Sequence, residues 1–158
     1  MNYKGIFFFL GIYSLFVSVF SFLNILYSIY FNFYLDLQSY IISLIFSLIV
    51  GSFFCFIGYE RRKNISLSDQ ILFIIVSFLF IPLLISIPYS LSIYDISFLD
   101  SYFESISGVT ATGFSNIPNI KDLDQPLLLW RSSSQWIGGL FFLVAIIGTV
   151  GSKQIKIK

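Results

Sequence analysis

The sequence predicts an all-α integral membrane protein, in which a helix hairpin is followed by two spans that enclose a short re-entrant segment. Its 158 residues are 57% hydrophobic and 11% charged, with a mean hydropathy of +0.89 and no histidine, which is unlike an average soluble domain. The uncharged stretches that are long enough to cross a hydrocarbon core of about 30 Å as helices are 5–35, 37–59, 70–94 and 132–152.

The first two stretches form the predicted N-terminal unit, residues 1–64. The apolar interval 5–35 far exceeds the roughly 7–15-residue core of a cleavable signal peptide, so we expect it to be retained as a helix. A polar turn near Asp36 joins it to the second helix, and the basic segment 60–64 follows as a cytoplasmic loop.

The second unit, residues 65–158, begins with Ser66 and Asp69, which are suited to cap a helix. Residues 105–120 are too short and too rich in small residues to span a membrane. The predicted segments of this unit are an outward span over 71–93, a short helix over 99–108, an extended loop over 109–115 and an inward span over 127–151.

Basic residues determine the predicted orientation, because cationic loops stay on the cytoplasmic side. If the chain crosses four times, most of its nine Lys and Arg residues fall on the side of the N-terminus, namely Lys4, Arg61, Arg62, Lys63, Lys153, Lys156 and Lys158. We therefore expect a multi-pass protein with a cytoplasmic N-terminus. Most acidic residues fall on the other side, where they either raise the local cation concentration or serve only as loop and cap residues.

The short helix is followed by the motif Thr-x-Thr-Gly, and we expect Gly108 to end that helix. A potassium filter replaces the water around the ion with stacked backbone carbonyls, which requires extended backbone, small side chains and a glycine. An ordinary Gly- and Thr-rich loop is the alternative. The residues that meet the requirements of a filter, and whose carbonyls we expect to bind potassium, are Val109, Thr110, Ala111, Thr112 and Gly113.

Two longer motifs strengthen this interpretation. Residues 103–115 read Phe-Glu-Ser-Ile-Ser-Gly-Val-Thr-Ala-Thr-Gly-Phe-Ser, and residues 129–139 read Leu-Trp-Arg-Ser-Ser-Ser-Gln-Trp-Ile-Gly-Gly. Together they resemble the first pore repeat of the Trk/Ktr/HKT potassium transporter superfamily, and most of all the TrkH-type membrane subunit of bacterial Trk systems. TrkH-type chains carry an extra helix pair before that repeat, which residues 5–59 resemble. The short helix would then be a pore helix in a membrane–pore–membrane repeat.

The resemblance implies potassium uptake across a bacterial inner membrane, with Gly113 at the position where glycine favours potassium over sodium. Family members fold four such repeats around one pore, whereas this chain contains one. We therefore expect an N-terminal fragment that requires the remaining repeats, or else several assembled copies, and that is inactive alone. The resemblance also implies a homodimer of complete chains and a cytosolic nucleotide-binding regulatory subunit.

Two side-chain roles complete the expectations for the repeat. Arg131 and Glu104 fall at the same level of the membrane, which suggests that they pair behind the filter. Gly138 and Gly139 are expected to pack the last span closely against its neighbours, because small residues let helices approach each other.

Other classes of protein fit the sequence less well. Without histidine there is no Ser–His pair or His-ligated zinc site, and the carboxylates fall in loops and caps rather than inside spans. We expect no enzyme activity and no cofactor, with potassium and membrane lipid as the small-molecule partners. A net charge of +1 gives no support for nucleic-acid binding. A small membrane scaffold without transport activity remains the alternative function.

Overall fold

The computed structural model describes residues 2–61 and 66–154, with backbone alone for residue 61 and residues 148–154. Within these ranges the chain is helical and contains no β-strand, which confirms the predicted all-α class. Arg62, Lys63, Lys156 and Lys158 lie outside the described residues. The elements are α1 (Tyr3–Tyr30), α2 (Leu37–Gly58), the 3-10 helix η1 (Tyr59–Arg61), α3 (Leu67–Ser90), α4 (Phe98–Val109), the 3-10 helix η2 (Ile120–Asp122) and α5 (Gln125–Gln154).

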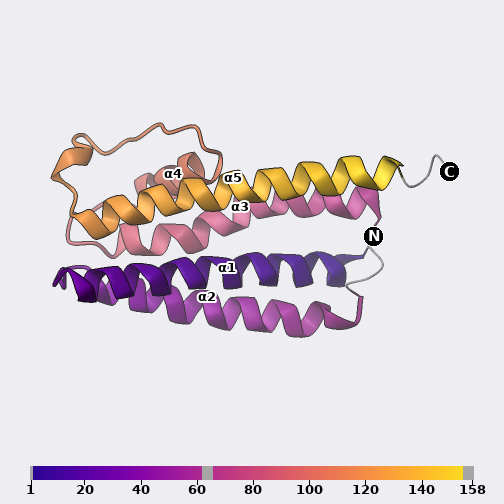
Figure 1. Cartoon of the computed structure of the whole chain (residues 1–158), viewed down its shortest axis with the longest axis horizontal. Coiled ribbons are helices and arrows are strands. Elements are labelled where there is room, and N and C mark those ends of the chain that lie inside the picture. Colours follow the sequence, from indigo (N-terminus) through magenta and orange to yellow (C-terminus); the bar gives the residue numbers. More distant parts are fainter. Residues whose placement is uncertain (1, 62–65, 155–158) are drawn as a thin grey trace.

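The long helices lie side by side, with the hairpin of α1 and α2 packed against α3 and α5 (Figure 1). The short helix α4 lies near one end of the bundle and contacts α3 and α5. Within the described residues, α1, α2 and α3, of 28, 22 and 24 residues, are long and apolar enough to cross a membrane. The fourth predicted span lies within α5, whose last side chains are not described, and it stays a prediction.

Helix α1 ends earlier than the uncharged interval 5–35 suggested, because a Schellman motif stops it. Asn32 adopts a positive φ of 61°, a conformation that asparagine tolerates better than most residues. The amide of Phe33 donates to the carbonyl of Ser28 at 2.8 Å, and the amide of Asn32 donates to that of Ile29 at 3.3 Å. These bonds occupy carbonyls that a helix end otherwise leaves free.

Small residues hold α1 and α2 together. A Cβ added to Gly11 would lie 2.6 Å from the amide nitrogen of Cys55, so the two backbones touch there. The Ser21 and Ser43 hydroxyls lie 3.1 Å apart across the interface. In lipid there is no hydrophobic drive between helices, so close backbone approach and polar contacts stabilise such a pair. The buried serines of the two helices are Ser14, Ser18, Ser21, Ser28, Ser39, Ser43 and Ser47.

Helix α3 starts four residues before the predicted span 71–93. Its first turn carries the expected cap, in which the Ser66 hydroxyl accepts from the Asp69 amide and Asp69 accepts from the Ser66 amide. The amide of Asn2 also donates to Asp69, at 2.9 Å. Both Pro82 and Pro88 lie inside this helix. The α3 carbonyls near the prolines receive side-chain donors, including the Trp130 indole on Ile85 at 3.0 Å.

Candidate functional site

The site is built around α4, which runs one residue farther at each end than the predicted 99–108. The side chain of Ser97 accepts from the Asp100 amide and starts the helix. The buried face of α4 consists mostly of small residues, and it packs against α5. A Cβ on Gly108 would collide with the Ser134 side chain. Gly108 therefore allows close packing inside the helix, and the expectation that it ends the helix is wrong.

A second Schellman motif ends α4 instead. The amide of Thr112 donates to the carbonyl of Ser107 at 3.1 Å, and the amide of Ala111 donates to that of Gly108 at 2.9 Å. Ala111 occupies the left-handed position of the motif, with φ of 54°, where glycine is usual. The loop over 109–115 was expected to be extended, but it begins with a turn. The reason is that its amides donate hydrogen bonds to carbonyls of α4.

Replacing Ala111 with glycine is expected to stabilise the chain by about 1 kcal/mol, because the left-handed conformation penalises a Cβ but not glycine. Thermal unfolding of the purified protein in detergent measures this. An equivalent change at Ala145, inside α5, serves as the control and should destabilise by about 0.5–1 kcal/mol. A lower melting temperature for Ala111→Gly would contradict the assigned backbone conformation.

The loop after the turn presents backbone carbonyls on an exposed surface. Residues 110–114 are exposed, and Gly113 has a φ of 78° with nothing within 4 Å of an added Cβ. Within the described part of the chain, the carbonyls of Thr110, Ala111 and Thr112 accept no hydrogen bond. The carbonyl of Val109 differs, because it lies against Gly138 of α5. The structure therefore brings four of the five sequence-predicted residues to one exposed loop and places Val109 in the buried end of α4.

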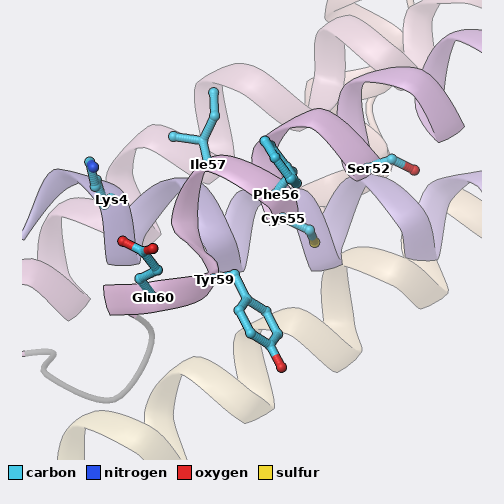
Figure 2. A pocket seen from close by; sticks show the side chains of 7 residues that line it. All are labelled: Lys4, Ser52, Cys55, Phe56, Ile57, Tyr59 and Glu60. Atoms are coloured by element: carbon cyan, nitrogen blue, oxygen red, sulfur yellow. The ribbon is translucent and has the colours of Figure 1, made fainter.

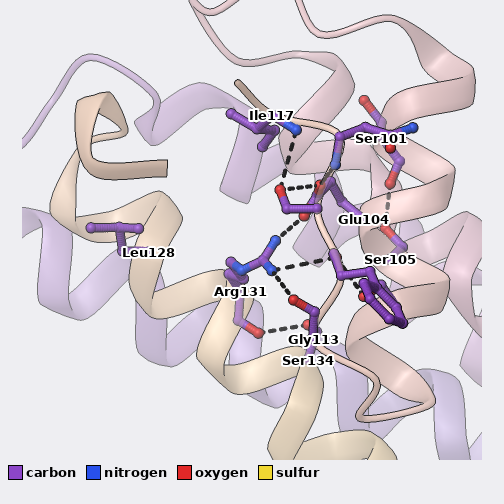
Figure 3. Close-up of polar contacts among 12 residues, drawn as sticks. Ser101, Glu104, Ser105, Gly113, Ile117, Leu128, Arg131 and Ser134 are labelled. Atoms are coloured by element: carbon purple, nitrogen blue, oxygen red, sulfur yellow. Dashed lines mark hydrogen bonds and ion pairs between the residues drawn. The ribbon is translucent and has the colours of Figure 1, made fainter. Parts of the chain in front are cut away.

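Glu104 and Arg131 form the expected pair behind this loop (Figure 3). Glu104 is fully buried and the Arg131 side chain is 11% exposed. The other carboxylate oxygen of Glu104 accepts from the Ser115 hydroxyl at 2.5 Å and from the Asn116 amide at 2.8 Å. Arg131 also donates to the carbonyl of Gly113 at 3.2 Å. The pair thus connects α4 and α5 to residues 113–116 at the end of the loop.

An acidic hollow of about 490 Å³ lies beside the start of α4, lined in part by Asp95, Asp100 and Asp122. Asp100 accepts from the Ser97 hydroxyl at 2.6 Å and from the Asn116 side chain at 3.2 Å. These hydrogen bonds, first from Ser97 and then from Asn116, lower the pKa of Asp100 below its ordinary value. The carboxylate is therefore charged at neutral pH, and the hollow attracts cations.

A second hollow lies where α2 ends, lined by Lys4, Ser52, Cys55, Phe56, Ile57, Tyr59 and Glu60 (Figure 2). The thiol of Cys55 lies 3.7 Å from the Phe8 carbonyl, to which it can donate. Within the described residues, no group of three or more His, Cys, Asp or Glu side chains could hold a metal ion. Of the two hollows, the one beside α4 has the more acidic lining.

The long apolar helices define a helical membrane protein, in which a short helix and its exposed loop lie between α3 and α5 in the chain. Residues 36–158 match the family described as TrkH, cation transport protein. Because this match covers most of the sequence, the chain belongs to the TrkH family of cation transport proteins.

Known relatives support the same assignment. The chain is 37% identical over 102 residues to an uncharacterized cation transporter of Methanocaldococcus jannaschii, covering 61% of this chain and 22% of the relative. It is 30% identical over 118 residues to the Trk system potassium uptake protein TrkH of Halomonas elongata, covering 72% and 24%. The corresponding match to TrkG of Escherichia coli is 28% over 105 residues, covering 62% and 22%. The matched region thus makes up about a quarter or less of each relative, and no solved structure matches the chain significantly.

Proposed function

We propose that this chain contributes a pore repeat to a potassium uptake transporter, with backbone carbonyls of the loop after α4 as ligands for the ion. The observation that carries this proposal is the row of carbonyls from Thr110 to Thr112, which accept no hydrogen bond in the described part of the chain. Carbonyls that are left free at membrane depth must be satisfied by water or by a cation. Gly113 completes the ligand set, because a carbonyl oxygen has a second lone pair beside its bond from Arg131.

The position of α4 adds an electrostatic contribution. Its carbonyl end lies at the loop, and the negative end of a helix dipole favours a nearby cation by about 0.3–1 kcal/mol. The acidic hollow beside its N-terminus would raise the cation concentration near the same loop. Under this proposal the hollow faces the outside and the N-terminus faces the cytoplasm. Residues 1–64 form the extra hairpin and residues 65–158 form the pore repeat.

A closed ion path requires more protein than one loop can supply. We propose that further pore repeats of the same transporter type surround the filter in a bacterial inner membrane. The described loop presents an exposed surface to such neighbours, including Phe114, which is 72% exposed. A dimer of complete transporters and a cytosolic nucleotide-binding subunit are the further partners proposed on the basis of family membership.

Growth of an uptake-deficient bacterial strain at limiting potassium tests the proposal. The chain would be expressed alone, and joined to the later repeats of the Halomonas TrkH protein. We expect rescue only by the joined protein, because one repeat cannot enclose a pore. Rescue by the chain alone would mean that copies assemble. Failure of both, at normal expression, would favour the membrane scaffold without transport activity.

Replacing Gly113 with serine in the joined protein is expected to reduce potassium uptake about tenfold and to weaken its preference over sodium. A side chain is strained at φ of 78°, so the carbonyl would turn away from the ion path. Uptake of radioactive rubidium, with sodium as competitor, measures both effects. Gly139→Ser is the matched control, since nothing lies within 4 Å of an added Cβ there. Equal discrimination by the two variants would contradict the proposed filter.

A further inference from the structure

Among the described residues, four of the eight buried side-chain oxygens without a hydrogen-bond partner lie near the end of the bundle that carries the loop between α1 and α2. They are Asn24 Oδ1, Ser28 Oγ, Asp36 Oδ2 and the Tyr40 hydroxyl. None of these residues is more than 3% exposed. Native proteins satisfy nearly all buried polar groups, so several unsatisfied oxygens in one place require a partner that the protein itself does not provide.

The register of the hairpin places these oxygens opposite one another. The contact between Ser21 and Ser43 aligns the two antiparallel helices. Counted from this contact toward the loop, Asn24 and Tyr40 each lie three residues away. Ser28 and Asp36 each lie seven residues away, so the members of each pair are at the same level of the hairpin. Steps of three and seven keep residues on the same face of a helix. The four oxygens therefore lie along one seam between the ends of α1 and α2.

The second unit of the chain closes this seam. The side-chain amide of Asn24 donates to the Pro126 carbonyl at 3.1 Å, and the Ile93 amide donates to Asp36 Oδ1 at 3.0 Å. Asp124, two residues before Pro126, donates its amide to the Tyr94 hydroxyl at 2.7 Å. Tyr40 interacts electrostatically with both Asp124 and Asp36. The half-buried Asp124 carboxylate accepts from the Leu127 amide at 3.2 Å at the start of α5. A second carboxylate is thus within electrostatic range of the cluster.

The charge of the cluster is not balanced by the protein. Among the described residues, neither Asp36 nor Asp124 forms an ion pair, since Arg131 is held by Glu104. Burial raises the pKa of Asp36 above its ordinary value. Burial, followed by repulsion from Asp36, raises the pKa of Asp124 as well. Buried carboxylates are stable only with a cation, a proton or hydrogen-bond donors.

We propose that Asp36 and Asp124, with the neutral oxygens of Asn24, Ser28 and Tyr40, form a binding site for a calcium ion between the hairpin and the pore repeat. All of these groups are oxygen ligands, which hard cations prefer. Two carboxylates match the charge of a divalent ion. Calcium also accepts irregular sets of six to eight oxygens, whereas magnesium requires a near-octahedral set. The proposal does not depend on ion transport.

Binding is tested on the purified chain in detergent after treatment with a chelator. Terbium serves as a luminescent probe excited through tyrosine and is then displaced with calcium, while thermal unfolding is followed in parallel. We expect calcium to displace terbium and to raise the melting temperature. Asp36→Asn keeps the oxygen that accepts from Ile93 and is expected to weaken calcium binding about tenfold or more. Glu60→Gln removes an exposed carboxylate far from the cluster, at the hollow where α2 ends, and serves as the control that should leave binding unchanged.

Two results would overturn the proposal. In the first, calcium has no effect, the melting temperature rises as the pH is lowered, and Asp36→Asn abolishes that rise. The carboxylates would then share a proton. That sign follows because groups with raised pKa values lose stability as the pH rises through those values. If neither calcium nor pH has an effect, bridging water fills the cluster. Asp124→Asn provides a second variant with the same expected loss of binding if Asp36→Asn does not fold.

Discussion

Replacing Arg131 with alanine is expected to destabilise the chain by about 3–5 kcal/mol, because it leaves a buried carboxylate without its cation. Glu104 is fully buried, and Arg131 is the cation that pairs with it. The same variant removes the donor to the Gly113 carbonyl. We therefore expect the loop to shift, in addition to the lower stability of the chain. Thermal and denaturant unfolding in detergent measure the first effect, and rubidium uptake by the joined protein measures the second.

Lys121→Ala is the control for this variant, because Lys121 is an exposed cation of the same loop region. We expect it to change stability by less than about 0.5 kcal/mol. The double variant Glu104→Gln with Arg131→Ala should cost less than the two single variants together, since removing both charges leaves no buried ion unpaired. A single Arg131→Ala variant as stable as the Lys121→Ala control would show that the pair does not support the loop.

Replacing Gly138 with alanine is expected to destabilise the chain by about 1–3 kcal/mol, because the new methyl group would occupy the position of the Val109 carbonyl. That carbonyl belongs to backbone at the buried end of α4, so it cannot move aside as a flexible side chain could. Displacing α4 from α5 would shift the following loop, and uptake by the joined protein should fall together with stability.

The neighbouring Gly139 offers a matched control within the same helix. Nothing lies within 4 Å of a Cβ at this position, so Gly139→Ala should stabilise the helix by about 0.5–1 kcal/mol. The two variants are chemically identical and one residue apart, and only their surroundings differ. Equal effects of the two substitutions would contradict the close contact between α4 and α5.

Parts of the site were predictable from the sequence. The short helix, the cap at Ser66 and the pairing of Glu104 with Arg131 were predicted, because each depends on residue types at fixed spacing. The end of α4 was predicted wrongly. Glycine is the usual signal for a helix end, but Gly108 serves close packing, and the left-handed position falls on Ala111. Because position 111 carries alanine and not glycine, nothing in the sequence indicated that turn.

The cluster around Asp36 had no signal in the sequence at all. Its members are separated by up to about a hundred positions and become neighbours only when the hairpin packs against the second unit.

The sequence by itself determined the class of this protein, the number and approximate limits of its apolar segments and its family. These properties follow from local composition and from short motifs, which do not depend on packing. The tertiary structure decided which glycines separate helices, which carbonyls remain free and which carboxylates are buried. Those outcomes depend on contacts between distant segments, where a difference of one methyl group or one missing partner changes the result.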